Sequence, residues 1–319
     1  MIKEQTLIIF GAGANSSYGY PTGEELKRNI IEDFPNIYSK YEPAIPHDEL
    51  VTINEFCKAF DGSDDILIDY FLETCNNPQF VNYGKLAIMM FIAESEKKVS
   101  KMKNIDFTKD DWYPILFNKL VEGIRDPRAL NKNNKINFIT FNYDRFLEYR
   151  LTKSIKNKFS LDWENSYDIV NKFGIIHTFD RLPALPFEDK LKYYNYGEDI
   201  PFADIKEYAK KIKIVSERNQ IDKESIYGLI SGADKIYFLG FCYNKENLSL
   251  LDIYGNIIKN IKIYGTAYGL NEQKIYEVRK IIGREKAFAN ESGTFVVTPR
   301  VIYLEGNMKC KELLEKYFL

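Results

Sequence analysis

The 319-residue sequence has few of the residues that build metal sites and disulfide frameworks. It contains four cysteines and two histidines. No two cysteines are close enough for a C-x-x-C pair, which argues against a structural zinc ribbon. Their positions are Cys57, Cys75, Cys242 and Cys310. Isolated cysteines and the lack of a secretory segment predict a cytoplasmic protein.

The sequence also lacks a long hydrophobic run and an excess of either charge. The apolar run Leu86–Ala93 is far shorter than the roughly 20 residues of a membrane-spanning helix. The chain has 44 Lys and Arg residues against 46 Asp and Glu residues, so it has no overall field that attracts nucleic acid. We therefore expect a protein that acts without a membrane anchor and without direct binding to nucleic acid.

What the sequence does contain is an alternation of short apolar runs and helical periodicity. Six apolar runs are the predicted strands: Leu7–Phe10, Ile136–Phe141, Gly174–His177, Lys235–Gly240, Lys262–Gly265 and Val301–Leu304. Segments with helical spacing lie between most of them. This alternation predicts an α/β fold, with a Rossmann-like parallel sheet and helices on both faces.

The stretch between the first two predicted strands is helical throughout. From about Leu50 to Arg125, apolar residues recur at helical spacing, and no strand-like alternation occurs. We predict an all-helical insertion over residues 49–126, between the two parts, 1–48 and 127–319, of the α/β domain.

Three local predictions accompany this division. The pattern over Thr22–Asp33 predicts the first helix, opened by a capping box. Three prolines in Phe34–Asp48 predict an irregular connection, in which His47 is expected to be a surface residue. The charged residues at 94–103 are interpreted as a solvated helix face.

The first predicted strand leads into a glycine-rich turn. Leu7–Phe10 is followed at once by Gly11 and Gly13, and then by Gly19 before a helical pattern begins. A strand, a turn without Cβ atoms and a helix start form a place for a nucleotide phosphate, which the glycine N–H groups and the helix dipole face. Ser16 stands where the fingerprint G-x-G-x-x-G has its third glycine, so this is a nucleotide loop of another kind.

Polar and small residues follow most of the predicted strands. In an open parallel sheet the ligand lies beyond the carboxyl ends of the strands, so these residues are expected to converge in one crevice. In chain order they are Gly11, Gly13 and Asn15, then Thr140, Asn142 and Asp144, then His177, then Gly240, Cys242, Tyr243 and Asn244, and finally Gly265 and Thr266.

Four of these strand-end motifs resemble those of sirtuins. The matches are Gly11-Ala-Gly13-x5-Gly19-x-Pro21 with the nucleotide loop, Thr140-Phe-Asn142-Tyr-Asp144 with the Thr-Gln-Asn-Ile-Asp motif, His177 with the catalytic His-Gly, and Gly240-Phe-Cys242 with the Gly-Thr-Ser loop. They occur in the right order, each after a predicted strand. The resemblance covers roughly residues 1–35 and 130–270.

The sequence also departs from the sirtuin pattern. It has no four-cysteine ribbon after His177, Thr22-Gly-Glu replaces the usual Asp-Phe-Arg, and Thr178 replaces the glycine after the histidine. These departures are compatible with an NAD pocket, but they argue against a groove that binds an acyl-lysine peptide. The pattern is more similar to the sirtuin-like NADases of bacterial antiphage defence. That resemblance implies hydrolysis of NAD to nicotinamide and ADP-ribose, often in large assemblies or with a sensor partner.

The resemblance also implies roles for individual residues. NAD is the substrate, no metal is required, and a homo-oligomer or a regulatory partner protein is expected. Asn142 is expected to order a water or the ribose, His177 to act as general base, and Asp144 to orient the ribose or Asn142. The residues expected to bind NAD are Gly11, Ala12, Gly13, Asn15, Gly19, Thr140, Gly240, Cys242, Asn244 and Gly265.

Other interpretations stay open. Thr178 in place of glycine motivates a module that binds NAD or ADP-ribose without turnover, and a zinc-free deacylase or ADP-ribosyltransferase is a further alternative. His177 can be a structural histidine, while Asn142 and Asp144 can cap the following helix. The glycines can serve only a tight turn, and Cys242 can be a small buried filler.

Overall fold

The computed structural model describes residues 1–102, 110–214, 217, 221–257, 260–283, 286–289, 295–298 and 300–318. Within this part of the chain, six strands form one parallel sheet in the order β3-β2-β1-β4-β5-β8. These strands are β1 (Thr6–Phe10), β2 (Ile136–Thr140), β3 (Ile175–His177), β4 (Lys235–Leu239), β5 (Ile261–Thr266) and β8 (Arg300–Glu305). The predicted α/β, Rossmann-like fold is confirmed. A separate antiparallel pair, β6 (Lys286–Ala289) with β7 (Phe295–Thr298), was not predicted.

The strand order reverses next to the central strand β1, whose two neighbours are β2 and β4. All five residues of β1 are buried, as expected for a strand covered on both faces. Phe10 lies level with Thr140 on β2 and with Leu239 on β4, so the loops that follow these three strands begin at the same edge. This edge is the topological switch point, where ligands of open α/β sheets bind.

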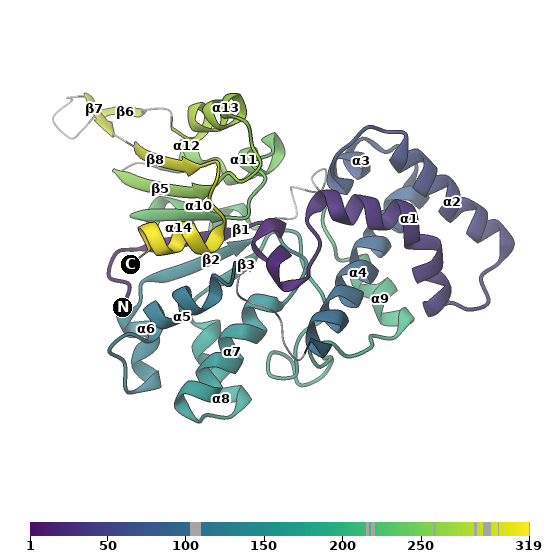
Figure 1. Cartoon of the computed structure of the whole chain (residues 1–319), viewed down its shortest axis with the longest axis horizontal. Coiled ribbons are helices and arrows are strands. Elements are labelled where there is room, and N and C mark those ends of the chain that lie inside the picture. Colours follow the sequence, from purple (N-terminus) through teal and green to yellow (C-terminus); the bar gives the residue numbers. More distant parts are fainter. Residues whose placement is uncertain are drawn as a thin grey trace.

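The helices fall into groups around and beside the sheet (Figure 1). One group stands to the right of the sheet and packs on itself: α1 (Gly23–Tyr41), α2 (His47–Asp61), α3 (Ile68–Thr74), α4 (Pro78–Lys101) and α9 (Phe202–Ala209). The others lie around the sheet: α5 (Tyr113–Val121), α6 (Leu130–Asn133), α7 (Phe146–Phe159), α8 (Trp163–Asn171), α10 (Lys223–Gly232), α11 (Lys245–Leu251), α12 (Ile253–Asn256), α13 (Glu272–Ile282) and α14 (Cys310–Tyr317).

The described residues between α1 and β2 form helices and no strand, as the periodicity indicated. Their grouping does not follow the predicted boundaries, however. Helix α1 belongs in sequence to the 1–48 part yet packs on α2 and α4, whereas α5 lies within 49–126 yet packs on α14 beside the sheet. A separate insertion over 49–126 therefore stays a prediction.

The predicted irregular connection over Phe34–Asp48 is wrong. Helix α1 continues through Pro35 to Tyr41, and α2 begins at His47, which is exposed as expected. Phe34, Ile37 and Tyr38 prolong the buried face of α1. Burial of such side chains is worth about 1.5–3 kcal/mol each, so the three together exceed the cost of about 3 kcal/mol for a proline inside a helix.

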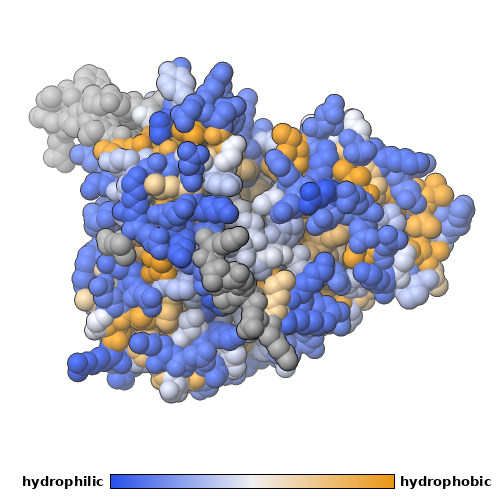
Figure 2. Space-filling view, in the orientation of Figure 1, coloured by the Kyte–Doolittle hydropathy of each residue, from blue (hydrophilic) through white to orange (hydrophobic). Residues whose placement is uncertain are grey.

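The surface of the molecule mixes hydrophilic and hydrophobic residues. On the face shown in Figure 2, hydrophilic residues dominate and hydrophobic residues form scattered groups. None of the described helices combines the length and the apolar character that a membrane-spanning segment requires.

The loops after β1 and β4 pack directly on each other at the switch point. The Gly13 N–H donates to the Gly240 carbonyl oxygen over 3.0 Å. Gly240 has a φ of +59°, and a Cβ there would overlap the backbone nitrogen of Ala14. A Cβ on Gly11 would approach the Gly240 oxygen to 2.6 Å. These glycines allow the backbones of the two loops to touch. This agrees with the interpretation that the glycines serve a tight turn, and it adds close packing on the loop after β4.

We expect Gly240→Ala to lower the free energy of unfolding by about 2–5 kcal/mol, because it adds left-handed strain to a backbone overlap. Gly228→Ala is the matched control, because Gly228 lies inside α10 and a Cβ there would meet no neighbouring group of the described chain within 4 Å. That variant should gain about 0.4–1 kcal/mol. Urea unfolding midpoints measure both, and equal midpoints for wild type and Gly240→Ala would contradict the packing argument.

Candidate active site

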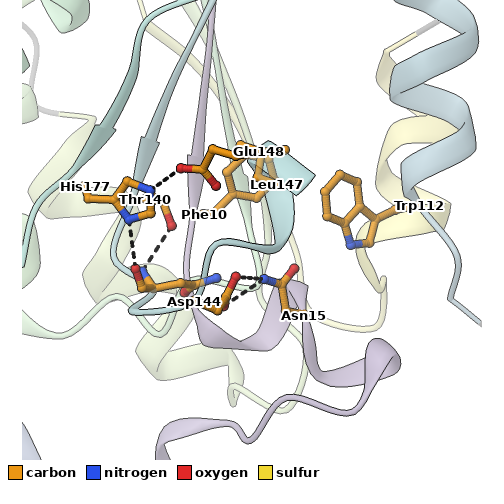
Figure 3. Close-up of a pocket in the computed structure, with 9 residues that line it drawn as sticks. Phe10, Asn15, Trp112, Thr140, Asp144, Leu147, Glu148 and His177 are labelled. Carbon is orange, nitrogen blue, oxygen red and sulfur yellow. Dashed lines mark hydrogen bonds and ion pairs between the residues drawn. The ribbon is translucent and has the colours of Figure 1, made fainter. Parts of the chain in front are cut away.

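A pocket lies at the carboxyl ends of β1, β2 and β3 (Figure 3). Its cavity volume is about 10 Å³, which leaves room for about one water molecule in this conformation. The structure brings five predicted site residues together here, with four further ones. The lining residues are Phe10, Asn15, Trp112, Thr140, Asn142, Asp144, Leu147, Glu148 and His177.

The glycine-rich loop beside this pocket is not arranged as predicted. The N–H groups of Gly11 and Gly13 donate to the carbonyl oxygens of Leu239 and Gly240, each over 3.0 Å. In this conformation they do not face a phosphate. Ala12 begins a 3₁₀ turn, and Gly19 ends the next one. Gly11, Ala12, Gly13 and Gly19 are outside the pocket lining.

The predicted residues after β4 and β5 also lie outside the pocket lining. Asn244 caps α11 by accepting a hydrogen bond from the Asn247 N–H over 2.7 Å. Gly265 is placed beside the Tyr243 hydroxyl. Cys242 is exposed, so its interpretation as a buried filler is wrong. The structure therefore separates this group from the residues that follow β1, β2 and β3.

Asp144 is held at the start of α7 by two partners. The Asn15 side-chain amide donates to both carboxylate oxygens, each over 3.0 Å, and the Phe146 N–H donates to one of them over 3.0 Å. The bond from Phe146 satisfies the first N–H of α7, whose N-cap residue is Arg145, while Asp144 also lines the pocket. Burial raises the pKa of Asp144 to about 6.

His177 contacts acceptors through both of its ring nitrogens. Nε2 lies 2.5 Å from Glu148 Oε1, and Nδ1 lies 3.2 Å from the main-chain oxygen of Asn142 (Figure 3). A carboxylate and a carbonyl both accept hydrogen bonds, so both ring nitrogens face acceptors. The geometry joins the ends of β2 and β3 to the first turns of α7.

Glu148 was missed by sequence reasoning. It lies four residues after Asp144, and this spacing places both carboxylates on one side of a helix start. Burial raises the pKa of Glu148, but the charges of His177 and Arg181 outweigh burial and lower this pKa to about 2. Arg181 Nε lies 3.8 Å from Glu148 Oε1. Glu148 is therefore ionised near neutral pH.

Two buried acceptor atoms on residues that line the pocket have no partner. Asn142 Oδ1 and Glu148 Oε2 make no hydrogen bond within the described part of the chain. Buried polar groups are rarely left unsatisfied, and such exceptions often mark a place for a water or a ligand. A ligand that offers hydroxyl groups would satisfy both acceptors.

Thr178 has a structural task at the end of β3. Its N–H and its hydroxyl both donate to the main-chain oxygen of Thr140, over 3.0 and 3.1 Å. Where sirtuins carry glycine, this chain thus fastens β3 to β2 beside His177. The Thr140 hydroxyl in turn accepts from the Asn142 N–H over 3.1 Å, which fixes the turn that presents Asn142.

The segment before α5 contributes an aromatic wall that the motifs did not indicate. The Trp112 ring lies 5.3 Å from the Phe10 ring, and its Nε1 donates to the Ala14 oxygen over 2.7 Å. Tyr18 donates to Asp111 over 2.7 Å from the turn after β1. The helical region between β1 and β2 therefore covers the β1 loop and closes one side of the pocket.

The interpretation of residues 94–103 as a solvated face is wrong at Glu96. Glu96 is 1% exposed and pairs with Arg145, which is fully buried. The Arg145 guanidinium also donates to four main-chain oxygens, of Pro183, Ala184, Tyr194 and Asn195. We call residues 183–197 the strap. Arg145, which directly follows Asp144, is therefore bonded to both α4 and the strap.

No group of three or more His, Cys, Asp or Glu side chains that could hold a metal ion is found in the described ranges. The acidic residues of the pocket are engaged instead by protein donors. Asp144 accepts from Asn15 and Phe146, and Glu148 contacts His177.

Asp144→Asn should remove one component of the pH dependence of stability. The folded-state pKa of about 6 exceeds the ordinary 3.8, so Asp144 contributes stability that is present below about pH 3.8 and lost as the pH rises through 6. Between pH 4 and pH 8 the variant should gain about 3 kcal/mol relative to wild type. Urea unfolding at several pH values measures this, with the exposed Asp61→Asn as control. Parallel curves for wild type and Asp144→Asn would contradict the buried ionisation.

A scan of family models gives no match to this chain, and a comparison with curated proteins gives none either. The likeness to sirtuin motifs therefore depends on the strand-end residues themselves.

Proposed function

We propose that this protein cleaves the nicotinamide–ribose bond of NAD and releases nicotinamide and ADP-ribose. The observation that carries this proposal is the meeting of Asn142 and His177 in one buried pocket at the carboxyl edge of a parallel sheet. Asn142 follows β2 and His177 ends β3, and they belong to the two motifs that resemble the catalytic motifs of sirtuins. Two acceptors of the pocket lining that have no partner among the described residues, Asn142 Oδ1 and Glu148 Oε2, suit a ribose, which presents hydroxyl donors.

The chemistry follows from the charges of the pocket. As the bond from ribose C1′ to the nicotinamide nitrogen breaks, its electron pair goes to the nitrogen, and the ring leaves as a neutral base. Positive charge develops on the ribose, and a water adds its oxygen to C1′. Asn142 Oδ1 is placed to accept a hydrogen bond from that water or from a ribose hydroxyl.

The proton of the attacking water needs an acceptor. His177 was the predicted base, but both of its nitrogens face acceptors in this structure. Asp144 suits the task better, because its pKa of about 6 is close to the working pH. We therefore assign proton uptake to Asp144, and to His177 the positioning of Asn142 through its main-chain oxygen.

The size of the pocket limits which part of NAD it receives. A volume of about 10 Å³ holds about one water molecule, so the pocket would have to widen before the ribose end of NAD enters it. The remainder of NAD would extend over the β1 loop toward the ends of β4 and β5, where Gly240, Asn244 and Gly265 lie. Binding would require this edge to widen, since the Gly11 and Gly13 N–H groups are bonded to carbonyls.

Unrestrained hydrolysis of NAD would harm the cell that makes this protein. We therefore propose that activity depends on oligomerisation or on a regulatory partner, as in the defence enzymes that the motifs resemble. The helical group α1–α4 with α9 stands beside the sheet and offers a surface for such control (Figure 1). An antiphage role, with depletion of NAD as its effect, is the corresponding biological proposal.

Purified protein should release nicotinamide from NAD, alone or once cell extract is added. Asn142→Ala and His177→Ala should each lower the rate by at least about 100-fold, because each removes a group that positions the reacting atoms. Chromatographic separation of NAD, nicotinamide and ADP-ribose measures this.

His47→Ala is the control, since His47 is exposed on α2 and far from the motifs in sequence. Thermal unfolding establishes that each variant is folded. Tight binding of NAD without nicotinamide release would favour the binding module, and release that depends on an acylated peptide or a protein acceptor would favour a transferase. Absence of turnover under all these conditions would refute the proposal.

A further inference from the structure

We propose that Glu148 is a catalytic residue of this pocket, which binds a ribose hydroxyl through Oε2 while Oε1 stays on His177. The inference rests on the proposed function for the identity of the ligand. It concerns a residue that lies outside the four sirtuin-like motifs.

The geometry gives Glu148 one occupied and one unoccupied oxygen. Oε1 lies 2.5 Å from His177 Nε2, while Oε2 is buried and has no partner among the described residues. The side chain is only 5% exposed, so this oxygen is shielded from bulk solvent. Figure 3 shows the second oxygen on the side of the carboxylate away from the histidine contact. An ionised acceptor in this position has a strong preference for an O–H or N–H donor.

The charges around Glu148 keep it in this role. Arg181 faces it as a cation, His177 contacts it through Nε2, and Arg181 is itself held by Glu188 through two contacts of 2.8 and 3.0 Å. Asp144 is the nearby group of like charge. Because His177 and Arg181 favour the carboxylate over the acid, Glu148 is a poor proton acceptor near neutral pH. Its contribution is a fixed negative charge and a hydrogen-bond acceptor.

Such a charge matters most when the bond to nicotinamide breaks. The ribose then carries positive charge, and a hydroxyl bonded to a carboxylate becomes a better donor, so the interaction strengthens in the transition state. Asn142 Oδ1 is the second unsatisfied acceptor of the same pocket. The pocket lining thus offers one acceptor for each of the two hydroxyl groups of a ribose diol.

The test compares Glu148→Gln, Glu148→Asp and wild type in two assays. Glu148→Gln keeps the shape and removes the charge, so kcat for NAD should fall at least tenfold with a smaller change in KM. Calorimetry with ADP-ribose as the probe should show binding weakened at least tenfold. Glu148→Asp keeps the charge and should recover part of both losses.

Glu305→Gln is the control for the loss of an ion-paired carboxylate. Glu305 is partly buried and pairs with Lys316, but it ends β8 at the opposite edge of the sheet from β3 and is outside the pocket lining. The nitrogen signals of the His177 ring should move in Glu148→Gln and stay in place in Glu305→Gln, with His47 as the internal reference because the chain has two histidines.

The outcomes separate this inference from the proposed function. If ADP-ribose binding depends on Glu148 but NAD is not hydrolysed, the inference stands and the proposed function fails. If Glu148→Gln binds ADP-ribose as wild type does, or if wild type does not bind it, the inference is overturned. Unmoved His177 signals in Glu148→Gln would also overturn it.

Discussion

The buried ion pair between Arg145 and Glu96 is the interaction on which the site depends. Removing a guanidinium from water is costly, and only a full set of acceptors offsets that cost. Arg145 obtains this set from Glu96 on α4 and from four carbonyls of the strap, residues 183–197. Asp144 precedes Arg145 and Glu148 follows it by three residues. Both pocket carboxylates are therefore carried by a helix start that one buried cation fixes to two other segments.

A second constraint operates at the switch point of the sheet. Gly11 and Gly13 touch the loop of Gly240, so the backbone groups expected to face a phosphate are used to join two loops. The same packing fixes the turn that carries Asn15, whose amide then reaches both oxygens of Asp144. The glycine-rich loop therefore shapes the pocket, because it holds Asn15 against Asp144. Its contact with a nucleotide would require a rearrangement of this edge.

The sequence indicated the sheet and part of the pocket because local rules were sufficient for them. Apolar runs marked the strands, and the rule for parallel sheets brought Asn142 and His177 to one edge. Glu148, Trp112 and the burial of Glu96 were not foreseen, because each depends on a partner far away in the chain. A charged residue in a helical pattern is solvated unless such a partner exists, and periodicity does not reveal partners. Only the four-residue spacing between Asp144 and Glu148, at the start of α7, could have indicated Glu148 as a site residue.

The two carboxylates of the pocket differ because their surroundings differ. Burial keeps the pKa of Asp144 high, near 6, while His177 and Arg181 hold that of Glu148 near 2. Environments that separate two such groups commonly separate their roles in catalysis. A group that titrates near neutral pH can accept a proton, whereas one that stays ionised can stabilise a cation. In the proposed reaction, the segment that opens α7 would therefore carry both the proton acceptor and the fixed negative charge.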